Sequence, residues 1–132
     1  MRLTIVRGLP GSGKTTYAKK HFDCLHLEND MMWVVDGKYE FKPEIYVEQK
    51  THLRYLVREA LGFGIDVVVS STFITAADID AYRNLAEAYK ADFKVIRCSG
   101  SFKSTHEVPE VRFQQMAADF EDYPGEEFAC SD

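Results

Sequence analysis

A glycine-rich segment near the amino terminus constrains the fold of this chain more than any other feature. Residues 8–15 read Gly-Leu-Pro-Gly-Ser-Gly-Lys-Thr. They follow a short β-rich run at residues 3–6 and lead into residues 14–22, which have a helical composition. This order predicts a strand, a tight loop and a helix at the start of the domain.

The rest of the chain continues the alternation of strands and helices. Residues 67–69 are three valines, the apolar run that a parallel strand covered on both faces requires. The Asp-Gly pair at 36–37 predicts a small β-hairpin insertion near residues 33–41. Further strands are expected at residues 24–27, 65–70 and 93–98, and helices at residues 43–62, 75–89 and from 109 onward. The predicted fold class is α/β, a three-layer sandwich of a mainly parallel sheet with helices on both faces.

The length of 132 residues fits one domain that needs neither disulfides nor metals to fold. We expect this domain to span residues 1–122. Residues 123–132 are expected to form an acidic tail with little to bury, which leaves disorder open. The formal charge of −5 disfavours a broad nucleic-acid-binding surface but leaves a local basic groove open. These features leave the oligomeric state open as well.

Cysteine spacing and apolar run length indicate where the protein works. Cys24, Cys98 and Cys130 lack CxxC or zinc-ligand spacing, so buried free thiols are expected. The chain leads from Met1 directly into the first predicted strand, which leaves no room for a signal peptide. No apolar run approaches membrane-spanning length, so we expect a reducing, cytoplasmic location and no membrane partner.

Residues 8–15 match the Walker A pattern Gly-x-x-x-x-Gly-Lys-Thr of a phosphate-binding P-loop. Glycines let backbone N–H groups turn inward around phosphate oxygens, and the following helix adds its positive end. Lys14 is expected to reach the β- and γ-phosphates, and Thr15 to hold Mg²⁺ through its hydroxyl. The predicted nucleotide-binding residues are Gly8, Pro10, Gly11, Ser12, Gly13, Lys14, Thr15 and Thr16. The motif predicts a P-loop NTPase sandwich that binds a nucleoside triphosphate, with ATP as the default because no guanine-reading motif is apparent.

Carboxylates after the second predicted strand are the candidates for chemistry. Asp30 stands where a kinase keeps a group that accepts the proton of the attacking hydroxyl or binds Mg²⁺ through water. A turn or cap aspartate is the alternative reading, and Glu28 is a weaker candidate for the same role. The third main strand ends in Ser-Ser-Thr at residues 70–72, where many P-loop proteins place a Walker-B aspartate. Metal binding is therefore expected to depend on Thr15, Asp30 and water.

Three basic residues could neutralise the charge that develops during phosphoryl transfer. Lys103 and Arg112 flank an irregular segment after the last predicted strand, and Arg97 lies nearby. A cation from such a segment usually closes over the transferred group. The alternative for each is a solvated surface charge.

Several short motifs together resemble one known family. They are the loop at residues 8–16, Asn29-Asp30, the hairpin Asp-Gly-Lys-Tyr-Glu-Phe at 36–41, and Thr-His-x-Val-Pro at 105–109. Over about residues 3–120 the chain resembles the P-loop kinase domain of phage polynucleotide kinases and NEDD4-binding proteins, an AAA-type P-loop ATP-binding domain. The resemblance implies ATP- and Mg²⁺-dependent phosphorylation of a polynucleotide 5′-hydroxyl, with Lys14 and Thr15 on the triphosphate and Asp30 as general base. Lys103 falls at the family's lid arginine and keeps its charge without the planar fork.

Two departures from this family leave the acceptor open. The family's Asp-Thr-Asn after the third strand reads Ser-Thr-Phe here at 71–73, and Trp33 replaces the arginine that holds the acceptor phosphate. A small-molecule or nucleoside kinase therefore stands beside the polynucleotide kinase as an enzyme reading. A nucleotide-binding module with slow or no hydrolysis is the reading from a different class.

Overall fold

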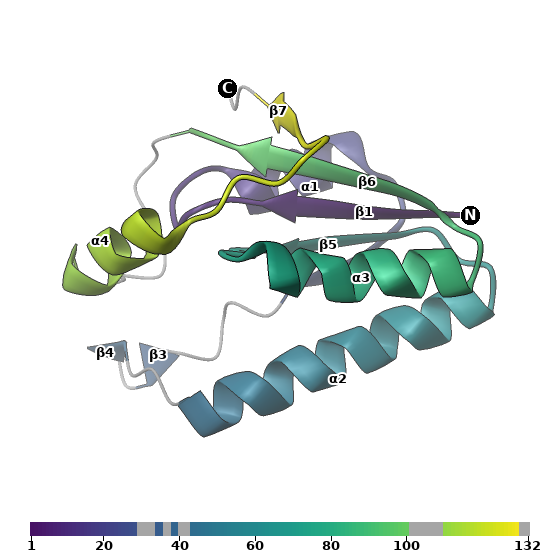
Figure 1. Ribbon diagram of the computed structural model, residues 1–132, viewed down its shortest axis with the longest axis horizontal. Helices are drawn as coiled ribbons and strands as arrows, with labels where there is room; N and C mark the ends of the chain where they lie inside the picture. Colours follow the sequence, from purple (N-terminus) through teal and green to yellow (C-terminus); the bar gives the residue numbers. More distant parts are fainter. Residues whose placement is uncertain (29–33, 36–37, 40–42, 101–109, 130–132) are drawn as a thin grey trace.

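The computed structural model describes residues 1–28, 34–35, 38–39, 43–100 and 110–129, in which strands and helices alternate (Figure 1). The strands are β1 (Arg2–Arg7), β2 (Leu25–Glu28), β3 (Val34–Val35), β4 (Lys38–Tyr39), β5 (Val67–Ser71), β6 (Asp92–Cys98) and β7 (Glu127–Ala129). The helices are α1 (Lys14–His21), α2 (Pro43–Gly62), α3 (Ala76–Ala88) and α4 (Glu110–Asp119). The predicted α/β fold class is confirmed.

The main sheet has the strand order β2-β5-β1-β6-β7, and every neighbouring pair in it is parallel. β1 lies in the centre, with Leu3 opposite Val67 of β5 and Phe93 of β6. Because all five strands run in the same direction, their carboxyl ends share one edge of the sheet. The loop that follows β1 therefore lies at the edge where ligands bind in open α/β sheets.

Helices cover both faces of this sheet, as expected (Figure 1). Successive side chains of a strand point to opposite faces. Leu3 and Ile5 of β1 accordingly belong to a core packed under α2 and α3, which contribute Leu53 and Ile79. Val6 belongs to a second core beneath α1. One core lies between the sheet and helices α2 and α3, and the other lies between the sheet and α1, which gives the sandwich its three layers.

β3 and β4 form a separate antiparallel hairpin in which Val34 pairs with Tyr39. This confirms the hairpin insertion predicted near residues 33–41. The Asp-Gly turn that motivated the prediction lies outside the described residues.

The carboxyl-terminal segment corrects one expectation. Residues 127–129 form β7, which pairs with β6, and Tyr123 is only 4% exposed. An acidic tail open to disorder is therefore the wrong interpretation for residues 123–129, while 130–132 lie outside the described part. The acidity was misleading because the carboxylate of Glu126 serves a buried arginine, Arg7 of β1.

The thiols of Cys24 and Cys98 are free, as predicted, and Cys130 lies outside the described residues. Cys98 is buried as expected, whereas Cys24 is only partly buried. Among the described helices, none is both long and apolar enough to cross a membrane.

Candidate nucleotide-binding site

The glycine-rich loop connects β1 to α1 and has the backbone that its sequence requires. Gly11 and Gly13 have φ angles of 81° and 89°, the left-handed region that side chains disfavour. The N–H of Ser12 donates to the carbonyl of Leu9 at 3.0 Å, which closes the turn. Gly13 is the N-cap of α1 and has no side chain with which to cap it. No side chain of the N-cap therefore competes for the N–H groups of the first turn, which is the arrangement that suits an anion at a helix end.

The first glycine of the motif is required by close packing. A Cβ on Gly8 would overlap Oγ of Ser12 and lie 2.9 Å from the carbonyl oxygen of Cys98. The N–H of Gly100 donates to the carbonyl of Ser12 at 3.2 Å, so the segment after β6 also holds the loop. Gly8 therefore lets the loop fold back against the end of β6.

Lys14 is 6% exposed although it carries a charge. Burial raises the pKa of the Cys98 thiol to about 11, and the positive charge of Lys14 opposes this shift. This coupling indicates that the lysine lies near the end of β6, at the edge that carries the loop. A buried ammonium in this place suits a site for negatively charged phosphate groups.

Thr15 takes part in a hydrogen-bonded cluster that joins α1, β2 and β5. Its hydroxyl donates to Oε2 of Glu28 at 2.9 Å. Oγ of Ser70 donates to the same carboxylate oxygen at 3.1 Å, and Nε2 of His26 lies 2.6 Å from Oγ of Ser70. The sequence made Glu28 a weaker candidate than Asp30, yet within the described residues Glu28 is the carboxylate that touches the P-loop.

The structure brings the predicted nucleotide-binding residues together at the start of α1 and the carboxyl end of β1. They are Gly8, Pro10, Gly11, Ser12, Gly13, Lys14, Thr15 and Thr16. Asp30, Lys103 and Trp33 lie outside the described residues, so the roles assigned to them stay predictions.

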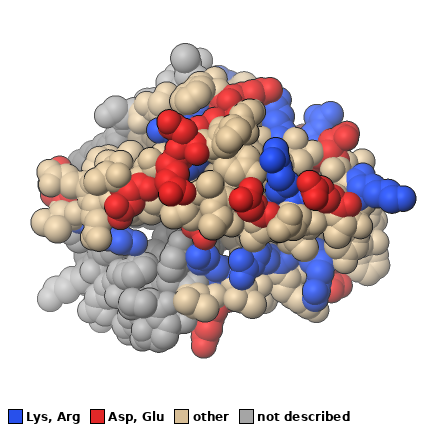
Figure 2. All heavy atoms as spheres, in the orientation of Figure 1, with Lys and Arg blue, Asp and Glu red and all other residues tan. Residues whose placement is uncertain are grey.

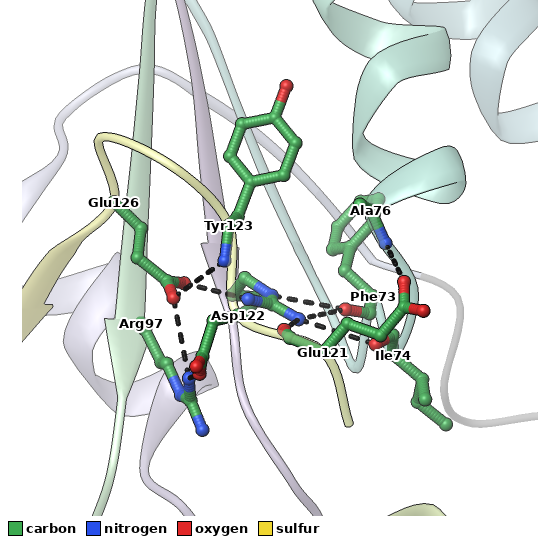
Figure 3. Close-up of polar contacts among 9 residues, drawn as sticks. Phe73, Ile74, Ala76, Arg97, Glu121, Asp122, Tyr123 and Glu126 are labelled. Atoms are coloured by element: carbon green, nitrogen blue, oxygen red, sulfur yellow. Dashed lines mark hydrogen bonds and ion pairs between the residues drawn. The ribbon is translucent and has the colours of Figure 1, made fainter. Parts of the chain in front are cut away.

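Arg97, a candidate cation for phosphoryl transfer, is paired with acidic side chains instead. Its guanidinium is bound to Oδ1 of Asp122 at 2.5 Å and Oε2 of Glu126 at 3.3 Å (Figure 3). It also stacks on the ring of Phe120. These contacts tie β6 to the segment before β7. They give no support to the idea that Arg97 closes over a nucleotide.

Arg7, which sequence reasoning missed, organises the region beside the loop. It directly precedes Gly8, is fully buried, and donates to the carbonyl oxygens of Phe73 and Glu121, each at 2.7 Å. It also forms an ion pair with Glu126 at 2.7 Å (Figure 3). Burial lowers the pKa of Arg7, and Glu126 opposes the shift. The sequence signal that could have predicted this buried arginine is its position at the end of an apolar strand.

Phe73 explains one departure from the resembled family. The residue has a φ of 45°, which is uncommon for a side chain of this size. The residue is 6% exposed, and its ring meets that of Tyr82 edge to face with the ring centroids 5.3 Å apart. Arg7 holds the carbonyl of this unusual turn, and position 73 is here a packing residue.

Residues 3–103 match the AAA domain family. An uncharacterised protein of Pasteurella multocida (strain Pm70) is 28% identical over 123 residues, which cover 80% of this chain and 69% of that protein. A crystal structure of a sugar kinase from Janibacter sp. HTCC2649 has a TM-score of 0.69 at 18% identity, covering 100% of this chain and 85% of that one. Kti12 of Chaetomium thermophilum, crystallised with ADP-AlF3, has a TM-score of 0.71 at 15% identity and covers 98% and 89%.

These likenesses confirm the predicted P-loop NTPase sandwich. The narrower resemblance to phage polynucleotide kinases and NEDD4-binding proteins stays a prediction. Since the family match spans most of the chain and includes the phosphate loop, this protein belongs to the AAA domain family and has a P-loop kinase-like domain.

Proposed function

We propose that this protein is an ATP-dependent phosphotransferase that moves the γ-phosphate of ATP to a hydroxyl group. The observation that carries the proposal is the P-loop geometry at the carboxyl edge of the sheet, with Lys14 buried beside it and the Thr15 hydroxyl fixed on a carboxylate. The similar Kti12 structure holds ADP-AlF3, and the similar sugar kinase is named for phosphoryl transfer, which supports this reading.

The residues present fit a magnesium ion bound together with the nucleotide. Mg²⁺ prefers hard oxygen ligands and usually keeps waters and substrate phosphates in its shell. Thr15 offers a hydroxyl oxygen, and the Glu28 carboxylate lies 2.9 Å from that oxygen. When bound, the ion would neutralise charge on the β- and γ-phosphate oxygens.

The remaining roles follow from the requirements of phosphoryl transfer. Backbone N–H groups of the loop and Lys14 bind the triphosphate and orient it. In this proposal Asp30 accepts the proton of the acceptor hydroxyl or would bind Mg²⁺ through water. Lys103 neutralises charge on the transferred group.

The acceptor has two candidates. The motif resemblance favours a polynucleotide 5′-hydroxyl. Trp33 in place of an acceptor-binding arginine and the net charge of −5 favour a small hydroxylated molecule such as a nucleoside or a sugar. On the face seen in Figure 2, acidic and basic side chains are mixed, and the described residues there form no continuous basic surface. A long nucleic-acid track would call for such a surface.

The test is transfer of radiolabelled γ-phosphate from ATP with Mg²⁺ to a panel of 5′-hydroxyl oligonucleotides, nucleosides and sugars. Wild type is compared with Lys14→Ala and Asp30→Ala. Label on one acceptor, lost in both variants, is the expected result. If no acceptor is labelled and wild type releases phosphate no faster than Lys14→Ala, the kinase proposal fails and a nucleotide-binding module remains.

A further inference from the structure

β5 ends without the carboxylate that usually supports a P-loop. In P-loop NTPases, a Walker-B aspartate at this strand end and the P-loop Ser or Thr together hold Mg²⁺. Here the strand ends in Ser70 and Ser71. On sequence alone this left open a protein with slow chemistry or none.

The neighbouring strand brings a carboxylate to the same place. β2 pairs with β5 in parallel, and the register sets Glu28 opposite Ser70. Oε2 of Glu28 accepts hydrogen bonds from Ser70 at 3.1 Å and from Thr15 at 2.9 Å. Resting on the function proposed above, we infer that Glu28 replaces the missing Walker-B carboxylate as the positioning residue for magnesium.

The direction of the Thr15 hydrogen bond explains how Glu28 supports a magnesium ion. A threonine hydroxyl has one proton and two lone pairs. Because the proton is donated to Glu28, the lone pairs stay available to a cation. The side chain of Glu28 is 26% exposed, so water can reach the carboxylate and bridge it to the ion. Glu28 therefore orients Thr15, the expected magnesium ligand, and would add negative charge beyond the groups that bind the ion directly.

His26 fixes the other end of this chain of hydrogen bonds. It lies two residues before Glu28 on β2, so both side chains project from the same face of the strand. The Ser70 proton is used on Glu28, so Oγ of Ser70 accepts from Nε2–H of His26 at 2.6 Å. His26, Ser70 and Thr15 together hold Glu28 in one orientation.

The deciding experiment measures how Mg²⁺ changes nucleotide affinity, which does not depend on turnover. The probe is a fluorescent, non-hydrolysable ATP analogue, titrated into each protein with Mg²⁺ and with EDTA. Wild type should bind more tightly with Mg²⁺. Glu28→Gln should lose about 10- to 100-fold of that gain, the usual effect of losing a supporting partner of a metal ligand, while its affinity in EDTA stays unchanged. Mn²⁺ affinity of the nucleotide complex, measured by electron paramagnetic resonance, should fall in parallel.

Two variants complete the design. Glu59→Gln removes an exposed carboxylate from the far half of α2 and should behave as wild type. Adding Ser70→Asp to Glu28→Gln returns the carboxylate to β5 and should restore part of the magnesium gain. Thermal unfolding of every variant confirms that each one is folded before the titration.

Several results would overturn the inference. One is a full magnesium gain in Glu28→Gln, and another is an equal loss of affinity with Mg²⁺ and with EDTA, which would make Glu28 a purely structural partner of the loop. A wild-type protein whose affinity ignores Mg²⁺ would also refute it. If the gain depends on Glu28 while no acceptor is ever phosphorylated, the inference stands and the proposed kinase function falls.

Discussion

Replacing Arg7 should destabilise this protein more than any surface substitution. The guanidinium is fully buried at the end of β1 and bonds two backbone carbonyls and the Glu126 carboxylate. Arg7→Met fills a similar volume but leaves a carboxylate that is 4% exposed without its main cation. Removing one partner of a buried ion pair costs about 3–5 kcal/mol. Carbonyls that lose their donors add to this cost, at about 1–3 kcal/mol for each one left unsatisfied.

Urea unfolding measures this loss. With a dependence on urea of about 1–3 kcal/mol per molar, a loss of about 4 kcal/mol lowers the midpoint by roughly 2 M. The midpoint should move while the slope stays constant, because the surface exposed on unfolding is nearly the same.

A double-mutant cycle separates the two sources of the loss. Adding Glu126→Leu to Arg7→Met removes the buried carboxylate. If the ion pair dominates, the double variant should be more stable than Arg7→Met alone, with a coupling of about 1–3 kcal/mol. If the carbonyl contacts dominate, no recovery follows. Arg7→Lys retains the charge but loses the planar fork, so it should fall between wild type and Arg7→Met. An Arg7→Met loss below about 1 kcal/mol would refute the reasoning.

The described contacts lead to three further predictions. Gly8→Ala forces a Cβ against Oγ of Ser12 and the backbone carbonyl oxygen of Cys98, so nucleotide affinity in a fluorescence titration and the midpoint of thermal unfolding should both fall; an unchanged affinity would contradict the packing argument. Gln49→Leu should raise the free energy of unfolding by about 1 kcal/mol, because the buried amide has no hydrogen-bond partner within the described residues, and a loss in urea unfolding would count against this. Burial raises the pKa of Cys98 from 9.0 to about 11, so its contribution to stability is complete below pH 9 and is lost as pH rises toward 11. Unfolding measured from pH 8 to 11 should show this decline in wild type and a weaker one in Cys98→Ala.

Local patterns in the sequence determined much of the fold. The phosphate loop was predictable because Gly11 and Gly13 must take left-handed backbone angles, and that requirement is visible as glycine in the sequence. The three valines of β5 predicted a central strand because burial on both faces requires an unbroken apolar run. Thr75 predicted the start of α3 because its side chain accepts from the N–H of Asp78, which is a contact within one turn.

Tertiary structure decided the features that depend on distant parts of the chain. Glu28 became the partner of Thr15 because the register of β2 on β5 sets it opposite Ser70, 42 residues away. β7 is short and its neighbouring residues are acidic, so the sequence resembled a tail. In the folded chain Glu126 pairs with Arg7, which lies 119 residues earlier.

The difference between these two sets of features depends on how far apart along the chain the interacting residues lie. Backbone angles and helix caps depend on neighbouring residues, so sequence by itself determined the loop and the order of the elements. The partner of a buried charge depends on which strands lie side by side and in which register. Only the folded chain decided that a carboxylate on β2 stands beside the P-loop threonine.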